Sequence, residues 1–158
     1  MSPKSREEGI EFVLKQAKEQ NVKFIKLWFT DILGMLKSFS ITTNELENAM
    51  TIGMGFDGSS IEGFLRIDES DMVAKPDPDS WVLLTPETGL NTENATKVNV
   101  ARMFCDIYLP SGEPFEGDPR YILKRNLQKA ADLGYTFYVG PELEFFYFKD
   151  RKGTEYLD

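Results

Sequence analysis

The sequence predicts a mixed α+β fold, because a helical pattern, two alternating patterns and a glycine-rich stretch follow one another in the first half of the chain. Of the 158 residues, 41% are hydrophobic, which is enough for a core. With 26 acidic and 18 basic side chains, the net charge is −8. We therefore expect no binding to nucleic acid and none to a membrane surface.

The first expected element is a helix over residues 6–20, and a strand begins at Val22. Ser5 and Glu8 have the spacing of a capping box at the start of the helix. The alternation of the strand places Val22, Phe24, Lys26 and Trp28 on one face and Lys23, Ile25, Leu27 and Phe29 on the other. The aromatic residues at strand positions that we expect in the core are Trp28, Phe29 and Phe104.

A hairpin and a short helix are expected next. Residues 31–34 predict a turn and residues 35–41 a second strand. Thr42 and Glu45 are typical of the start of a helix, which should end near Met50. Residues 51–71 contain several glycines and show neither helical nor strand periodicity, so we expect a long loop there.

The second half of the chain predicts four strands and one helix. Three strands are expected at residues 72–74, 81–84 and 98–108. Asp118 and Pro119 are typical of the start of a helix, which should stop at Gly134. A strongly apolar strand is expected over residues 135–148.

These elements predict two domains, the first over residues 1–110 and the start of a second over residues 111–158. The second region has one helix and one strand, too little to bury both faces of that strand. We therefore expect the chain to be a truncated piece of a longer protein.

The composition restricts the chemistry that is expected. Because the chain has no histidine, it cannot complete a Ser-His-Asp triad or a histidine metal site, and carboxylates must carry any catalysis. Cys105 lies in an apolar stretch and is expected to be a buried thiol in a reducing compartment. The sequence shows no signal peptide and no membrane span, so we expect a cytoplasmic protein.

Glu142 and Glu144 form the first candidate site. They are two positions apart in the expected strand, so both carboxylates should leave the same face, with Cα atoms roughly 6–7 Å apart. Carboxylates among aromatic neighbours are costly to desolvate unless cations accompany them, and metal ions would explain the pair. A solvent-facing strand edge with alternating glutamates is the alternative.

The glycine-rich stretch contains the second candidate, Asp57. It stands in the string Gly55 to Phe64, where small residues would let the backbone approach a ligand closely. Asp57 could act there as a general base. The same Asp-Gly-Ser-Ser string is also ordinary turn chemistry, in which the aspartate binds its own backbone, and this is the commoner explanation.

Two strings, taken together, resemble a known family. They are FDGSS at residues 56–60, followed by ESDM at 69–72, and GPELEFF at residues 140–146. Supporting strings lie at residues 29–34, 105–108 and 115–120. In this order they resemble the N-terminal part of bacterial and archaeal type I glutamine synthetases, and the similarity spans nearly the whole chain.

The resemblance implies a β-grasp N-terminal domain followed by the first helix and strand of an incomplete α+β catalytic domain. It implies that Asp57 takes a proton from ammonium, and that Ser60 and Asp71 help to hold its loop. Glu142 and Glu144 would each bind one of two Mg²⁺ or Mn²⁺ ions. The residues that bind ATP are expected mostly beyond residue 158.

The resemblance also implies an activity, that of an ATP-dependent glutamate–ammonia ligase forming glutamine through γ-glutamyl phosphate. The 158-residue chain alone is expected to be inactive. Glutamate, ammonium and ATP would be the substrates, and the full-length protein is expected to form a homo-oligomeric ring, a dodecamer. Two alternatives stay open: a related γ-glutamyl-amine ligase, and a β-grasp module that binds partners without catalysis.

Overall fold

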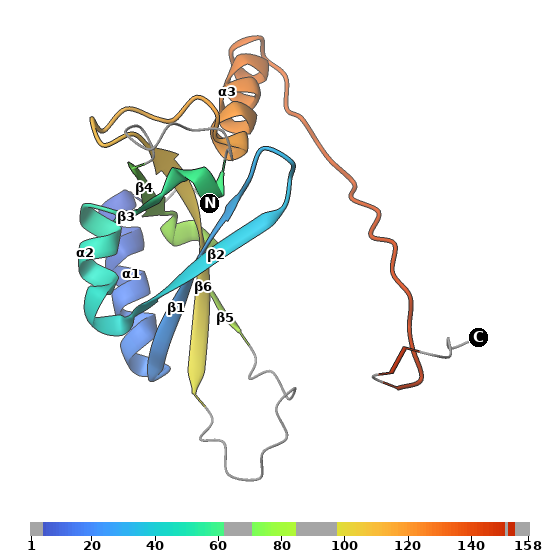
Figure 1. Ribbon diagram of the computed structural model, residues 1–158. Helices are drawn as coiled ribbons and strands as arrows, with labels where there is room; N and C mark the ends of the chain where they lie inside the picture. The colour runs from blue at the N-terminus through green and yellow to red at the C-terminus, as the bar shows by residue number, and fades with distance from the viewer. Residues whose placement is uncertain (1–4, 62–70, 85–97, 151, 154–158) are drawn as a thin grey trace. The chain divides into compact units, whose positions relative to one another are not determined.

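The computed structural model describes residues 5–61, 71–84, 98–150 and 152–153 (Figure 1). The chain divides into two compact parts, Met1–Asn126 and Leu127–Asp158. The helices are α1 (Arg6–Glu19), α2 (Leu46–Thr51) and α3 (Pro119–Asp132), and the short 3₁₀ helices are η1 (Thr43–Glu45), η2 (Gly58–Ser60) and η4 (Pro78–Ser80). The strands are β1 (Val22–Thr30), β2 (Leu36–Thr42), β3 (Met54–Asp57), β4 (Asp71–Pro76), β5 (Val82–Leu84) and β6 (Asn99–Tyr108).

A six-stranded sheet forms the centre of the first part. Its strand order is β2-β1-β6-β4-β3, and β5 also pairs with β6. β1 and β6 run parallel, whereas the other pairs are antiparallel. Figure 1 shows α1 and α2 close together against one side of this sheet. The prediction of an α+β fold is confirmed.

The first helix begins where the capping box predicts. The Ser5 hydroxyl accepts a hydrogen bond from the backbone N–H of Glu8, and the Glu8 carboxylate accepts one from the backbone N–H of Ser5. Val13 and Ala17, one helical turn apart, are buried against the sheet. Local sequence signals therefore suffice to place α1.

Burial differs from the prediction at two residues of β1, Val22 and Trp28, and at Phe104 of β6. Val22 is buried with Ile25 and Leu27, because the register with β6 shifts between Val22 and Phe24 and reverses the expected alternation. Phe29 lies in the core as expected. Trp28 and Phe104 do not; they lie half-buried on the opposite face, in edge-to-face contact with ring centroids 5.7 Å apart.

The predicted cap of the short helix is also wrong. The Thr42 side chain makes no capping hydrogen bond, and the segment begins as η1 before α2 starts at Leu46. The neighbouring Thr43 hydroxyl instead donates to the carbonyl oxygen of Val22 at 2.6 Å. This bond ties the end of the hairpin to the start of β1.

The stretch predicted as a long loop contains β3 and η2. Only two half-buried residues, Met54 and Phe56, alternate with exposed Gly55 and Asp57, and such a short alternation is too weak to recognise in a sequence. The pairing of β3 with β4 supplies the hydrogen bonds that the local sequence does not predict. Residues 62–70 of the expected loop lie outside the described residues.

Helix α3 begins and ends as predicted. Asp118 precedes it and accepts a hydrogen bond from the backbone N–H of Arg120 at 3.0 Å. Gly134 follows it with a φ of +81°, a conformation that favours glycine after a helix.

The apolar strand expected over residues 135–148 is absent. The backbone of residues 135–147 belongs to neither helix nor strand, and the aromatic side chains there are exposed. A strand needs a neighbour to accept its N–H groups and donate to its carbonyls, and among the described residues none pairs with this segment. High strand propensity without that neighbour does not produce a strand.

Candidate functional site

Asp57 lies at the last position of β3, where the strand turns into η2. The antiparallel pairing of β3 with β4 sets Asp57 opposite Asp71 and Phe56 opposite Met72. Asp57 and Asp71 are therefore neighbours at the edge of the sheet, and Ser60 ends η2 three positions after Asp57. All three side chains are exposed.

An aromatic cluster anchors β3 beneath this region. The Phe56 ring lies 4.8 Å from that of Phe29 on β1 and 5.8 Å from that of Phe39 on β2, measured between centroids. Such contacts add packing energy beyond the buried area. Because Phe56 precedes Asp57 directly, this cluster fixes the backbone from which the carboxylate projects.

The Asp57 carboxylate binds its own turn. One carboxylate oxygen accepts a hydrogen bond from the backbone N–H of Ser59 at 2.9 Å. This backbone hydrogen bond, followed by one from the Ser59 side chain, lowers the pKa of Asp57 below its usual value. The turn chemistry expected for the Asp-Gly-Ser-Ser string is confirmed, and it leaves an exposed, ionised carboxylate at the sheet edge.

The hairpin between β1 and β2 supports the other end of this loop. The backbone N–H of Ile32 donates to the carbonyl of Ile61, which is buried directly after η2. Asp31 holds the hairpin turn by accepting hydrogen bonds from the backbone N–H groups of Leu33 and Met35, at 3.0 and 2.8 Å. The sequence pattern indicates only a turn here, and Asp31 at the first position of the turn is the signal for these hydrogen bonds.

The candidate metal ligands, Glu142 and Glu144, lie in the second part of the chain, Leu127–Asp158. Glu142 and Glu144 are exposed and two positions apart in the irregular segment after α3. Within the described residues, no group of three or more Asp, Glu, Cys or His side chains is arranged to hold a metal ion. The structure thus shows two exposed carboxylates that are free to accept a ligand.

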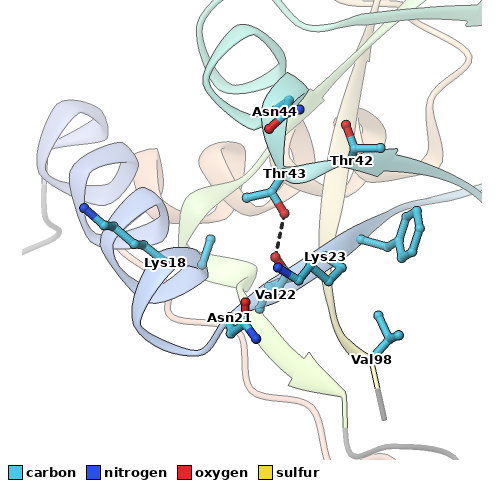
Figure 2. A pocket seen from close by; sticks show the side chains of 10 residues that line it. Lys18, Asn21, Val22, Lys23, Thr42, Thr43, Asn44 and Val98 are labelled. Carbon is cyan, nitrogen blue, oxygen red and sulfur yellow. Dashed lines mark hydrogen bonds between the residues drawn. The ribbon is translucent and has the colours of Figure 1, made fainter. Parts of the chain in front are cut away.

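A pocket of about 590 Å³ lies elsewhere, beside the first residues of β1 (Figure 2). Its lining includes Lys18, Lys23 and Thr43 but none of the predicted site residues. The ammonium group of Lys18 points away from Lys23 in Figure 2. These cations do not converge on a common point, and we assign no ligand to this pocket.

Comparison with protein families first defines the class of domain. A model described as "Glutamine synthetase, beta-Grasp domain" matches residues 21–110, and one described as "Glutamine synthetase, catalytic domain" matches residues 116–157. The sheet described above is thus the β-grasp domain of that family. The chain belongs to the glutamine synthetase family.

Individual relatives agree with this assignment. A protein named glutamine synthetase from Mycobacterium tuberculosis (strain H37Rv) is 51% identical over 139 residues, which are 88% of this chain and 30% of the relative. One from Staphylococcus aureus (strain N315) is 49% identical over 150 residues, 94% of this chain and 32% of the relative. The chain therefore spans about a third of the length of these relatives.

Solved structures have the same fold. A GmaS protein with ADP has a TM-score of 0.63 at 27% identity, covering 76% of this chain and 25% of its own. A Plasmodium falciparum glutamine synthetase has a TM-score of 0.66 at 24% identity, covering 85% of this chain and 24% of its own.

Among the described residues, no helix is both long and apolar enough to cross a membrane.

Proposed function

We propose that the protein carrying this chain is an ATP-dependent glutamate–ammonia ligase that forms glutamine. The main support is the order of the candidate residues along the chain. Asp57, an ionised carboxylate, lies within the match to the β-grasp domain of glutamine synthetase, and Glu142 and Glu144 lie within the match to its catalytic domain. In this reaction the side-chain carboxylate of glutamate attacks the γ-phosphoryl group of ATP, giving γ-glutamyl phosphate and ADP. Ammonia then displaces phosphate.

Asp57 would act on the second substrate. Ammonium has no free electron pair, so it must lose a proton before it can attack the acyl phosphate. An exposed carboxylate that stays ionised attracts the cation and accepts its proton. The hydrogen bond from Ser59 and the neighbouring Ser60 and Asp71 would hold Asp57 in position for this step.

Glu142 and Glu144 would supply ligands for Mg²⁺ or Mn²⁺. Both are exposed carboxylates, the donor type that hard divalent cations prefer, so these residues fit the group. Such ions, when bound, offset the negative charge of the transferring phosphoryl group. ATP and further ligands would bind residues outside this chain, since the chain spans only about a third of its relatives.

The organisation of the protein is proposed on the same basis. The β-grasp domain would cover residues 1–110 and the catalytic domain would begin within residues 111–158. We propose a cytoplasmic homo-oligomeric ring, a dodecamer, in which the Asp57 loop of one subunit serves the active site of the next.

The deciding experiment is an assay of the protein at its full natural length. With glutamate, ATP, Mg²⁺ and ammonium, it should form glutamine, ADP and phosphate in equal amounts. Formation of a γ-glutamyl amide from an alkylamine at a higher kcat/KM than with ammonium would instead identify a γ-glutamyl-amine ligase. Absence of turnover with any amine, together with absence of divalent-ion binding, would identify a non-catalytic module.

A further inference from the structure

Two cationic side chains lie side by side on the sheet face opposite α1 and α2. Lys26 of β1 is the register partner of Arg102 of β6. On the outer side of Lys26 stands Ser40 of β2, and on the outer side of Arg102 stands Val82 of β5. Because register partners in a sheet project from the same face, these four residues form one row across four strands.

Neither cation has a carboxylate partner among the described residues. Within the described part of the chain, Lys26 forms no hydrogen bond or ion pair, and Arg102 forms one hydrogen bond, from Nη1 to the carbonyl of Ser80 at 2.8 Å. The acidic residue on this face of β6 is Asp106, whose carboxylate is already bound by Arg120 and Lys124. Like charges directly opposite one another destabilise a sheet. In a chain with a net charge of −8, two neighbouring cations without a carboxylate between them are unexpected and suggest a function for the pair.

The guanidinium group of Arg102 is held in place. Its central carbon lies 5.2 Å from the Trp28 ring centroid and 4.9 Å from that of Phe104. These cation–π contacts and the bond to Ser80 restrict the side chain, while its remaining N–H groups have no acceptor among the described residues. An arginine fixed with free donors can bind an anion at little cost in side-chain entropy.

Apolar rows border the cations on both sides. Trp28 and Phe104 are register partners on one side, and Phe24 and Val100 on the other. These neighbours cover the stems of the two cationic side chains and leave their charged ends toward the solvent. The face is open, since Phe24 is 45% and Val82 40% exposed.

We propose that this face binds an oxyanion, a carboxylate or phosphate group, between Lys26 and Arg102. The Arg102 fork and the Lys26 ammonium would donate to the anion, and the Ser40 hydroxyl is placed to add a third donor. None of the proposed catalytic or metal-binding residues belongs to this row. The proposal therefore does not rest on the roles proposed for Asp57, Glu142 and Glu144.

Calorimetric titration of the full-length protein with inorganic phosphate, and separately with acetate, tests the proposal and distinguishes the two sources of oxyanion. We expect one class of sites whose Kd rises about tenfold in Lys26→Gln and in Arg102→Gln. Lys23→Gln is the matched control, because it removes the same charge from the same strand outside the row. Its Kd should equal that of the wild type.

Thermal unfolding supplies a second readout. Because Lys26 forms no hydrogen bond or ion pair with the described residues and stands opposite another cation, Lys26→Gln should unfold at the wild-type temperature or above it without ligand. The bound anion should raise the melting temperature of the wild type and of Lys23→Gln, but not that of Lys26→Gln. Unchanged anion affinity in both row variants would overturn the proposal. So would variants that alter only the oligomeric state, since the face would then be a subunit contact.

Discussion

The carboxylate of Asp57 accepts a hydrogen bond from the backbone N–H of Ser59, two residues ahead in the chain. This contact both closes the turn after β3 and lowers the pKa of Asp57. The two roles depend on different properties of the carboxylate. The turn depends on an oxygen that accepts a hydrogen bond, whereas binding and deprotonation of ammonium depend on the negative charge. The two roles can therefore be separated by substitution.

Asp57→Asn in the full-length protein should keep the turn and lose the charge. The amide oxygen can still accept from Ser59, so the melting temperature should stay near that of the wild type. Glutamine formation at limiting ammonium should fall by about 10²–10⁴-fold, the contribution typical of a positioned proton acceptor. Glutamate-dependent phosphoryl transfer from ATP should be less affected. An unchanged rate at limiting ammonium would refute the role of Asp57.

Glu142→Gln and Glu144→Gln should each weaken one divalent-ion site of the full-length protein. The amide keeps the shape of the side chain but lacks the charge that Mg²⁺ and Mn²⁺ require. Loss of a residue that only supports a metal ligand costs about 10–100-fold in affinity, so loss of a ligand's charge should cost at least about tenfold. Manganese titration followed by electron paramagnetic resonance measures both sites. Glu113→Gln, on an exposed turn, is the control. Wild-type binding in both variants would mean that the pair does not bind metal.

Local signals in the sequence predicted the first helix, the hairpin and the start of α3 correctly. Each depends on neighbours in the chain, as the capping box of Ser5 and Glu8 and the cap at Asp118 show. The failures depend on distant partners. β3 exists because β4 pairs with it, and residues 135–147 form no strand because no described strand pairs with them.

The same difference between local signals and distant strand partners applies to the candidate sites. The turn around Asp57 follows from its own string, but its position opposite Asp71 follows from strand pairing that the sequence did not predict. Neither pattern nor resemblance indicated the row of Lys26 and Arg102, because the two lie 76 positions apart and meet only through the parallel pairing of β1 and β6. The sequence did indicate the buried thiol: Cys105 is buried, and burial raises its pKa.

Asp31 should make stability depend on pH at the acidic end. The hydrogen bond from Met35 is the main cause that lowers its pKa, with help from Leu33 and Lys37. A carboxyl group whose pKa is lower in the folded state stabilises the fold above its unfolded pKa of about 3.9, and this contribution disappears as the pH falls through the folded pKa. The melting temperature of the wild type should therefore fall more steeply below about pH 4 than that of Asp31→Asn. Asp79→Asn, at an exposed residue whose carboxylate accepts no hydrogen bond from the described residues, should leave the wild-type slope unchanged.

Asp118 should matter for stability rather than for chemistry. It is 1% exposed, and its two carboxylate oxygens accept hydrogen bonds from different backbone N–H groups, those of Ile107 on β6 and Arg120 on α3. Burial raises its pKa, whereas these hydrogen bonds favour the charged form. The carboxylate thus joins the last strand of the sheet to the first turn of α3.

Asp118→Asn should destabilise the protein even though asparagine is a good helix cap in general. Its side chain has a single oxygen, so its NH₂ group must face one of the two backbone N–H donors. A buried donor left without an acceptor costs about 1–3 kcal/mol in the free energy of unfolding, which urea denaturation can measure. Glu116→Gln, two residues earlier and exposed, removes the same charge and should change the free energy of unfolding little. Equal stability of both variants would mean that the bond between Asp118 and Ile107 does not hold α3 to the sheet.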